Sequence, residues 1–319
     1  MNRHLVLCFL LAATTAVAQE YPTRPVRIVV PLSPGGFADT PTRMLAPRLS
    51  EQMGKQFFVD NRPGAGGTIG WDFVAKQPPD GYTLAITGST HLISSHLYKN
   101  LGYDAFKDFT HITMMASGPY VLVVNPKKVP VASVRELIAA AKAKPGAIDY
   151  ASSGNGSSQH LVGALFNAMT GVQLNHVPYK GSGPAMADLL GGHVMLMMDS
   201  AASALGPIVD RRIKALAVTT ARRAASPLDG IPPIADTLPG FDAAGWSGLA
   251  APARTPLEIV ARVNRDLQAL LKDPEMIRQI EQRAAMPAPG SPIEFAEFIK
   301  KEIDTWGEVV RATGTKPGN

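Results

Sequence analysis

Glycine and hydroxyl residues gather at two places in this 319-residue chain, each after a predicted strand and before a predicted helix. The first is Pro34-Gly35-Gly36-Phe37-Ala38-Asp39, followed by a helix expected to begin at Thr40-Pro41. The second is Ser153-Gly154-Asn155-Gly156-Ser157-Ser158, followed by a helix expected from Gln159 to Met169. Turns of this kind expose backbone N–H groups, and the helix dipole adds partial positive charge. The two segments therefore predict two anion-binding loops that face each other.

Further candidate ligand-binding residues follow other predicted strands. The carboxyl ends of parallel strands meet at one edge of a sheet, so we expect these residues beside the two loops. Glycine there allows close approach of a ligand, and hydroxyl and amide groups supply donors. The candidates are Ala65, Gly66, Gly88, Ser89, Thr90, Tyr179, Lys180, Gly181 and Asp199.

Several of these residues have two readings that the sequence alone leaves open. Asp39 either stabilises its own helix start or contacts an amino or hydroxyl group of a ligand. Asp199 either binds an amino group or bonds local backbone. Lys180 is either a counter-ion or a loop lysine that faces water. His91 and His160 lie beside candidate residues, and for His160 a hydrogen bond at the helix start is favoured.

Short apolar segments alternate with amphipathic helical segments along the chain, and this alternation is typical of an α/β protein with parallel sheets covered on both faces. The apolar positions near the C-terminus, from Leu257 to Leu270 and from Phe295 to Val310, are interpreted as core. The predicted strands are Val26–Val30, Phe57–Asp60, Thr83–Thr87, Phe109–Met115, Tyr120–Val124, Ile148–Ser152, Leu174–Pro178, Val194–Asp199 and Lys214–Thr219.

Two interruptions of this alternation indicate where the chain passes between domains. Residues 115–120 separate two predicted strands without a helix, and residues 227–248 are rich in proline and glycine. We therefore predict a signal peptide at 1–18, a first domain formed by 19–119 and 246–319, and a second domain formed by 120–245. The helices after Pro252 are expected to pack on the first domain. The cleft between the domains would hold the ligand.

The N-terminal residues have the pattern of an export signal. Arg3 and His4 precede an apolar run, and Ala16-Val17-Ala18 forms a small-residue cleavage site. Cys8, the one cysteine, lies inside this segment and too early for a lipoprotein site, so the mature chain is expected to carry no disulfide and no lipid anchor. We expect a soluble periplasmic protein with no metal and no cofactor.

Composition and motif content argue against several other functions. The formal net charge is +5, but the basic residues are scattered, which disfavours nucleic-acid binding. Gly245-Trp246-Ser247-Gly248-Leu249 lacks the last glycine of a nucleophile elbow. His91 and His96 do not have metalloprotease spacing, and no phosphate-binding P-loop or dinucleotide fingerprint is present. A binding protein is favoured over an enzyme.

Many short motifs in one order carry a more specific indication. In the first half they are Pro34-Gly35-Gly36 with Asp39, Asn61–Gly67 with Ile69-Gly70, Asp80–Leu84, Leu97-Tyr98-Lys99 and Tyr103-Asp104. In the second half they are Ser153–Ser157, Gln159-His160-Leu161, His176–Gly181, Pro184 and Asp188–Gly192. With these motifs nearly the whole mature chain resembles the extracytoplasmic solute-binding proteins of the tripartite tricarboxylate transporter family, often called the Bug family.

The resemblance implies a type II periplasmic-binding-protein fold, with two α/β domains, a ligand cleft between them and two hinge crossings. It implies capture of a small organic carboxylate, held largely by backbone groups and ordered waters of two cleft loops. It also implies delivery to a permease with one large and one small membrane subunit, by a protein expected to be a monomer. Ser94, Ala164 and Met197-Met198 depart from the common family pattern, which leaves the ligand open. A receptor for a sensor kinase, or a periplasmic hydrolase or lyase, are the alternatives.

Overall fold

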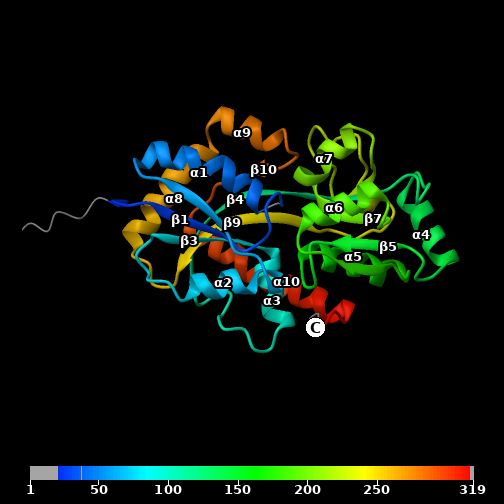
Figure 1. Ribbon diagram of the computed structural model, residues 1–319, viewed down its shortest axis with the longest axis horizontal. Helices are drawn as coiled ribbons and strands as arrows, with labels where there is room; N and C mark the ends of the chain where they lie inside the picture. The colour runs from blue at the N-terminus through cyan, green and yellow to red at the C-terminus, as the bar shows by residue number, and fades with distance from the viewer. Residues whose placement is uncertain (1–20, 37, 317–319) are drawn as a thin grey trace, which may run out of the picture.

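The computed structural model describes residues 21–36 and 38–316. The predicted signal peptide at 1–18, with Cys8, and the candidate Phe37 lie outside the described residues. The structure consists of two α/β lobes, drawn side by side in Figure 1, with two long strands running between them. None of the helices in the described part of the chain has the length and apolar character needed to cross a membrane.

The first lobe is built on three parallel strands, β1 (Val26–Val30), β2 (Phe57–Asn61) and β3 (Thr83–Gly88), in the order β2-β1-β3. Helices α1 (Asp39–Met53), α2 (Thr68–Ala75) and α3 (Ser89–Leu97) follow the three strands. β1 is fully apolar except for Arg27. Val26 and Val30 pack with α1 and α8, whereas Val29 packs with α2, as a strand covered on both faces requires. The loops that leave β1, β2 and β3 therefore emerge at one edge of this sheet.

The second lobe repeats this arrangement with β5 (Asp149–Ser152), β6 (Asn175–Pro178) and β7 (Leu196–Ser200), where β5 pairs in parallel with both of the others. Helix α5 (Ser158–Thr170) follows β5, α6 (Ser182–Gly191) follows β6, and α7 (Ala201–Val209) follows β7. Helix α4 (Val134–Ala143) and strand β8 (Lys214–Val218) complete the lobe. Its strand ends face those of the first lobe.

Two antiparallel strands connect the lobes: β4 (Phe109–Val124) and β9 (Ala244–Pro252). Along β4 the partner changes from β9, up to Pro119, to β7 and β8, from Tyr120 onward. The prediction of two separate strands over 109–115 and 120–124 was wrong, because residues 116–119 stay extended and paired. Proline lacks the N–H of a ladder bond, and here it sits where the partner changes.

The segment 227–248 was predicted to carry the second crossing between the domains. It contains the short 3₁₀ helix η2 (Ile234–Asp236), and β9 begins within it, at Ala244. The glycines of β9 are needed by its neighbours: a Cβ at Gly248 would lie 2.2 Å from the ring of Phe295. In β9, glycine is therefore required by close packing against neighbouring side chains and does not indicate a loop.

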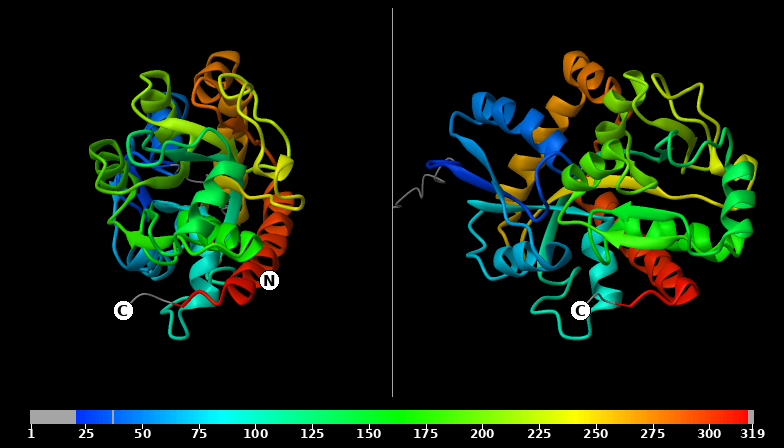
Figure 2. Two further views of the ribbon diagram at one scale, coloured as in Figure 1. Left: turned by 90° about the vertical axis from the view of Figure 1, so that its right-hand side faces the viewer. Right: turned by 45° about the vertical axis from the view of Figure 1, so that its right-hand side comes forward.

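The C-terminal part contains α8 (Leu257–Leu271), α9 (Pro274–Glu281), the short strand β10 (Met286–Pro287) and α10 (Pro292–Thr313). Helix α8 packs on the first lobe, as expected. Helix α10 packs on both lobes: Phe295 and Ile299 lie in a first-lobe cluster, whereas Trp306 lies in the main cluster of the second lobe. Figure 2 shows α10 extending from one lobe to below the other. The expectation that all the late helices serve the first domain was therefore incomplete.

Candidate ligand-binding site

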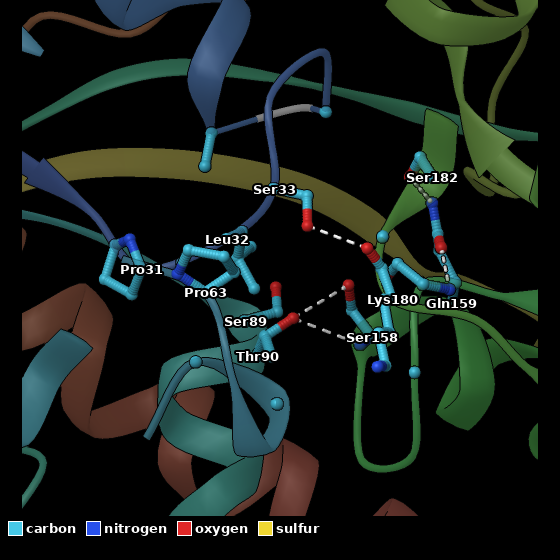
Figure 3. Close-up of a pocket in the computed structure, with 18 of the residues that line it drawn as sticks. Pro31, Leu32, Ser33, Pro63, Ser89, Thr90, Ser158, Gln159, Lys180 and Ser182 are labelled. Carbon is cyan, nitrogen blue, oxygen red and sulfur yellow. Dashed lines mark hydrogen bonds between the residues drawn. The ribbon is translucent and has the colours of Figure 1, made fainter. Parts of the chain in front are cut away.

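A cavity of about 690 Å³ lies between the two lobes, at the strand ends of both. Its walls come from the loops after β1, β2 and β3 of the first lobe and from the loops after β5 and β6 of the second. Figure 3 shows the facing loops, with Ser33, Ser89 and Thr90 on one side and Ser158, Lys180 and Ser182 on the other. The two lobes thus place polar side chains around one shared space, as a small-molecule site requires.

In the first lobe, the candidate residues that line the cavity are Gly36, Ala38, Ala65, Gly66, Gly88, Ser89 and Thr90. Ala65 and Gly66 belong to the 3₁₀ helix η1 (Ala65–Gly67) in the loop after β2. Gly66 has a φ of 66°, and a Cβ there would lie 3.2 Å from the carbonyl oxygen of Asn155 in the other lobe. Glycine at this position allows the two lobes to approach closely.

Pro34, Gly35 and Asp39 do not line the cavity. Helix α1 begins at Asp39 after the N-cap residue Ala38, two residues before the expected start with Thr40 as N-cap and Pro41 as the first helical residue. The Asp39 carboxylate is 2% exposed and accepts hydrogen bonds from Gly35 N, Arg43 Nε and Asn61 Nδ2 at 2.8–2.9 Å. Burial opposes ionisation, but these donors prevail and lower the pKa of Asp39. Of its two readings, the structure shows the first: Asp39 holds its own loop and helix start.

In the second lobe, Ser153, Asn155, Ser158, Tyr179, Lys180 and Gly181 line the cavity, whereas Gly156, Ser157 and Asp199 do not. The Ser157 hydroxyl caps α5 by accepting from His160 N. Tyr179 Oη donates a 2.7 Å hydrogen bond to Asp188, which fixes the tyrosine on its own lobe. Lys180 is exposed, and it is the one basic residue among the described lining residues, which include no Asp or Glu.

The expectation that the loop after β5 offers unpaired main-chain donors was largely wrong. Ser153 N donates to Gln159 Oε1, Gly154 N to Ser152 Oγ, and Gly156 N to His160 Nδ1. Ser157 N donates to the Gly154 carbonyl, and Ser158 N to Thr90 Oγ1. Side chains and neighbouring carbonyls use these amides because the loop must hold its own tight turn. Little of this loop's backbone remains to bind an anion.

Helix starts at the cavity offer donors instead. Helices α2, α3 and α6 begin at lining residues with the glycine N-caps Gly67, Gly88 and Gly181, and none has a side-chain cap. Of the helices that begin elsewhere, α4, α9 and α10 are capped by Ser133, Asp273 and Ser291, and α8 has no side-chain cap. Helix α5 also begins at the cavity, but Ser157 caps it. An uncapped helix start leaves N–H groups and a partial positive charge for an anionic group. α3 belongs to the first lobe and α6 to the second, so the cavity receives such a start from each side.

Hydrogen bonds join the lobes directly beside the cavity. Ser33 Oγ donates to the Lys180 carbonyl at 2.7 Å. The Thr90 hydroxyl accepts from Ser158 N at 3.2 Å across the same gap. Within the second lobe, the Ser158 hydroxyl accepts from Tyr120 Oη at 2.7 Å. Figure 3 shows the bonds of Ser33 and Thr90 spanning the gap between the lobes. The structure is therefore a closed form in which the two half-sites meet.

Aromatic side chains form another part of the wall. Trp71 from α2, Tyr98, Tyr120 from β4 and Trp246 from β9 line the cavity. Trp246 Nε1 donates to Glu302 Oε2 at 2.6 Å, and Trp306 Nε1 donates to the same atom at 3.0 Å. His91 does not line the cavity, since it is fully buried behind Trp71, stacked at 4.6 Å between ring centroids. Burial lowers the pKa of His91 to about 3, so its ring is neutral.

Sequence reasoning missed several lining residues, because strand and helix patterns give no indication of them. Ser33 lies inside the first loop but was passed over for the glycines. Gln159 was predicted only to begin a helix. Ser182 directly follows Gly181, which was predicted to bind the ligand, but Ser182 itself was not. The other lining residues not predicted are Pro31, Leu32, Pro63, Gly64, Trp71, Ile86, Thr87, Tyr98, Tyr120, Pro178 and Trp246.

Two α/β lobes that share two connecting strands and close around a cavity define a two-domain solute-binding protein of the type II periplasmic class. Residues 42–315 match the model of the family described as tripartite tricarboxylate transporter family receptor (TctC), and the chain belongs to this family. Known members of the family are periplasmic binding proteins, so the chain is a solute-binding receptor and not an enzyme.

Individual relatives cover almost the whole chain. Protein BugT of Bordetella pertussis is 36% identical over 324 residues, which covers 99% of this chain and 99% of BugT. The solved structure of R. palustris Rpa4515 with adipate is 39% identical, with a TM-score of 0.90, and covers 93% of this chain and 100% of that one. MatC from Rhodopseudomonas palustris, with bound malate, is 29% identical with a TM-score of 0.85, over 91% of this chain and 100% of that one.

Proposed function

We propose that this chain binds a small organic carboxylate in the cavity between its lobes and delivers it to a membrane transporter with one large and one small subunit. We propose further that the chain is exported by cleavage after residue 18, carries no lipid anchor and acts as a monomer. The proposed domain boundaries are 119/120 and 245/246. The change of β4 partner between Pro119 and Tyr120 supports the first of these.

The observation that carries the proposal is the pair of uncapped helix starts from opposite lobes. Gly88, Ser89 and Thr90 start α3, and Gly181 and Ser182 start α6; all five line the same cavity. A carboxylate between them would receive donors from both lobes at once, and only when the lobes are closed. A ligand with this property shifts the population toward the closed form.

The charge of the wall supports a carboxylate of modest size. The described lining residues include no acidic side chain to repel an anion, and Lys180 is the one cation. Hydroxyl groups of Ser89, Ser153 and Ser158 supply additional donors. The relatives solved with adipate and malate bind compounds of this class.

Purified chain lacking residues 1–18 tests the proposal in a thermal-shift screen of carboxylates that includes adipate and malate. At about one hundred times its dissociation constant, a true ligand stabilises the folded state by about 2.7 kcal/mol. The matched control is the uncharged diamide of each acid, which keeps the shape and removes the charge. A chain that responds equally to acid and amide, or to no acid in the screen, would contradict carboxylate binding.

The transporter assignment needs a separate test, because a receptor for a sensor kinase would use the same cleft. Deletion of the gene is expected to abolish uptake of the radiolabelled ligand identified in the screen, with restoration by the intact gene. Unchanged uptake with a lost transcriptional response would favour the sensor. Light scattering of the purified protein tests the monomer.

A further inference from the structure

Asp199 lies at the end of β7, directly behind the cavity wall. The residue is 0% exposed and does not line the cavity. Gln159, in the first turn of α5, lies between Asp199 and the cavity and does line it. Gln159 Nε2 donates to Asp199 Oδ1 and also, at 2.8 Å, to Ser182 Oγ. Ser153 N donates to Gln159 Oε1 at 2.7 Å.

These contacts fix which way the Gln159 amide faces. Its NH₂ group points to the Asp199 carboxylate, which can only accept hydrogen bonds when it is ionised. Its oxygen points to the Ser153 N–H, which can only donate. The reversed amide would place oxygen against carboxylate at one end and N–H against N–H at the other. Ser200 N, at 2.7 Å, holds Asp199 Oδ1 in place from the other side. The orientation of Gln159 is therefore set from β7.

Gln159 in turn joins the two second-lobe loops of the cavity. Ser153 belongs to the loop after β5, and Ser182 is the first residue of α6, whose uncapped start faces the cavity. Figure 3 shows Gln159 and Ser182 side by side and linked on the second-lobe wall. A shift of the Gln159 side chain would release both loops together.

We propose that Asp199 is a positioning residue for ligand binding, which acts through Gln159 to hold Ser153 and Ser182 where they face the ligand. This inference rests on the function proposed above and assigns Asp199 no contact with the ligand. It replaces both readings considered from the sequence, in which the carboxylate binds a ligand amino group or only its own backbone.

The energetic cost of Asp199 agrees with such a role. Burial raises the pKa of Asp199 to about 6, although the nearby Ser203 and Ser182 hydroxyls and the Ser200 amide lower it. Its Oδ2 atom has no hydrogen-bond partner in the described part of the chain. A buried carboxylate that is only partly satisfied costs stability, and an apolar residue would fill the same volume without that cost. What the carboxylate contributes is a fixed geometry at Gln159.

The test compares Asp199→Ala, which removes the acceptor, with Asp199→Asn, whose side-chain oxygen can still accept from Gln159 Nε2. Asn125→Ala is the matched control, because Asn125 is also a buried polar residue of the second lobe but is bonded to Leu189, Lys127 and no residue of this group. Calorimetry measures the dissociation constant for adipate as the probe, or for another acid that stabilises the wild type. Hydrogen exchange at Ser153 and Ser182 is followed without ligand, and thermal unfolding is recorded for each variant.

We expect Asp199→Ala to raise the dissociation constant about tenfold or more and to speed exchange at Ser153, while Asp199→Asn stays within about threefold of wild type. Asn125→Ala should lower the melting temperature without changing affinity or exchange. If Asp199→Ala does not fold, Gln159→Met, which keeps the chain length and removes all three hydrogen bonds, is expected to give the same loss. Wild-type affinity and exchange in Asp199→Ala, or in Gln159→Met, would overturn the inference. A wild type that binds no carboxylate would instead overturn the proposed function, and the exchange data would still decide whether Asp199 holds the loops.

Discussion

Ser33 Oγ donates a hydrogen bond to the main-chain carbonyl of Lys180, 2.7 Å away and 147 residues later in the chain. The bond joins the loop after β1 to the loop after β6, and with it the first lobe to the second. Because it can exist only when the lobes are closed, it stabilises the closed form relative to the open one.

Substitution Ser33→Ala is therefore expected to weaken ligand binding without damaging the fold. A hydrogen bond of this kind contributes about 0.5–1.5 kcal/mol, which corresponds to a loss of roughly two- to twelvefold in affinity. Calorimetry with the carboxylate identified in the screen measures the change. Ser95→Ala, which removes a similar hydroxyl on the outer side of α3, is the control. Equal affinities for the two variants would show that the bond does not contribute to closure.

Gly181→Ala is expected to hinder closure more strongly. A Cβ at Gly181 would lie 2.6 Å from Ser33 Cβ and 2.8 Å from Ser33 Oγ in the opposite lobe, and the φ of 116° is unfavourable for alanine in either form. We expect at least about a tenfold loss of affinity. Ser33→Gly also lacks the hydrogen bond to Lys180, so it is the reference for the double variant Ser33→Gly with Gly181→Ala. In that background the contact is gone and only the backbone strain remains, so Gly181→Ala should cost less affinity than it does in the wild type.

The control for this prediction is Gly183→Ala, because a Cβ at Gly183 meets nothing within 4 Å. Its affinity should match wild type. An equal loss of affinity on adding Gly181→Ala to the wild type and to Ser33→Gly would mean that backbone strain, and not contact across the cleft, causes the effect.

Glu302 is expected to be a stability residue. Its Oε2 atom accepts from the indoles of Trp246 in the cavity wall and Trp306 on the second lobe. Glu302→Leu would leave two buried N–H groups without partners, at a cost of about 3 kcal/mol in the free energy of unfolding. Urea unfolding measures it. Glu297→Leu, at an exposed position of the same helix, should change stability little, and an equal effect of both variants would refute the role.

His160 is expected to make the fold sensitive to acid. Burial lowers the pKa of His160 to about 4, and that of the stacked His176 to about 3. Below about pH 6.5 the unfolded chain gains a proton that folded His160 does not, so stability falls as the pH drops toward 4. Between about pH 7.5 and 4.5, the free energy of unfolding should fall by roughly 2 kcal/mol less in His160→Asn than in the wild type, a figure reduced because His160 keeps some solvent contact. Urea unfolding at several pH values tests this, with the exposed His193→Asn as control; identical pH profiles of all three proteins would contradict it.

Asp199 should have the opposite effect on the pH dependence of stability from that of His160. Its folded pKa of about 6 lies above the ordinary value of 3.8, so the folded form binds a proton before the unfolded form does. Wild-type stability should therefore rise relative to Asp199→Asn as the pH falls from about 7 to 4, by about 2–3 kcal/mol. Chemical unfolding of both proteins across this range gives the difference, and a difference that does not depend on pH would show that Asp199 titrates normally.

The sequence predicted the fold well where one segment determines its own structure. The apolar run Val26–Val30 is β1, with the predicted bounds. β4 and β9 were misread because Pro119 and the glycines of β9 look like loop residues, and only their partner strands keep them extended. The type of fold and the segments that contain the two crossings could be predicted, whereas the form of the crossings as continuous strands depends on the pairing of β4 with β9.

The sequence predicted where the candidate site lies better than it predicted which groups of the site are free to bind a ligand. Strand ends and glycine turns placed Gly36, Gly88 and Gly181 at the cavity. The sequence could not show that Gln159 and His160 use the amides of the loop after β5, because this depends on side chains that fold back from α5. Nor could it show that α3 and α6 begin uncapped on opposite lobes.

Helix α10 is the last element of the chain, yet its first turns pack on one lobe and its last turns on the other. It is therefore a third connection between the lobes, beside the two connecting strands. A hinge motion that opens the lobes must have its axis close to α10 or must detach the last turns of α10 from the second lobe. The rate at which solute enters and leaves should consequently depend on the end of α10, so that a tag or truncation at the C-terminus would alter exchange kinetics.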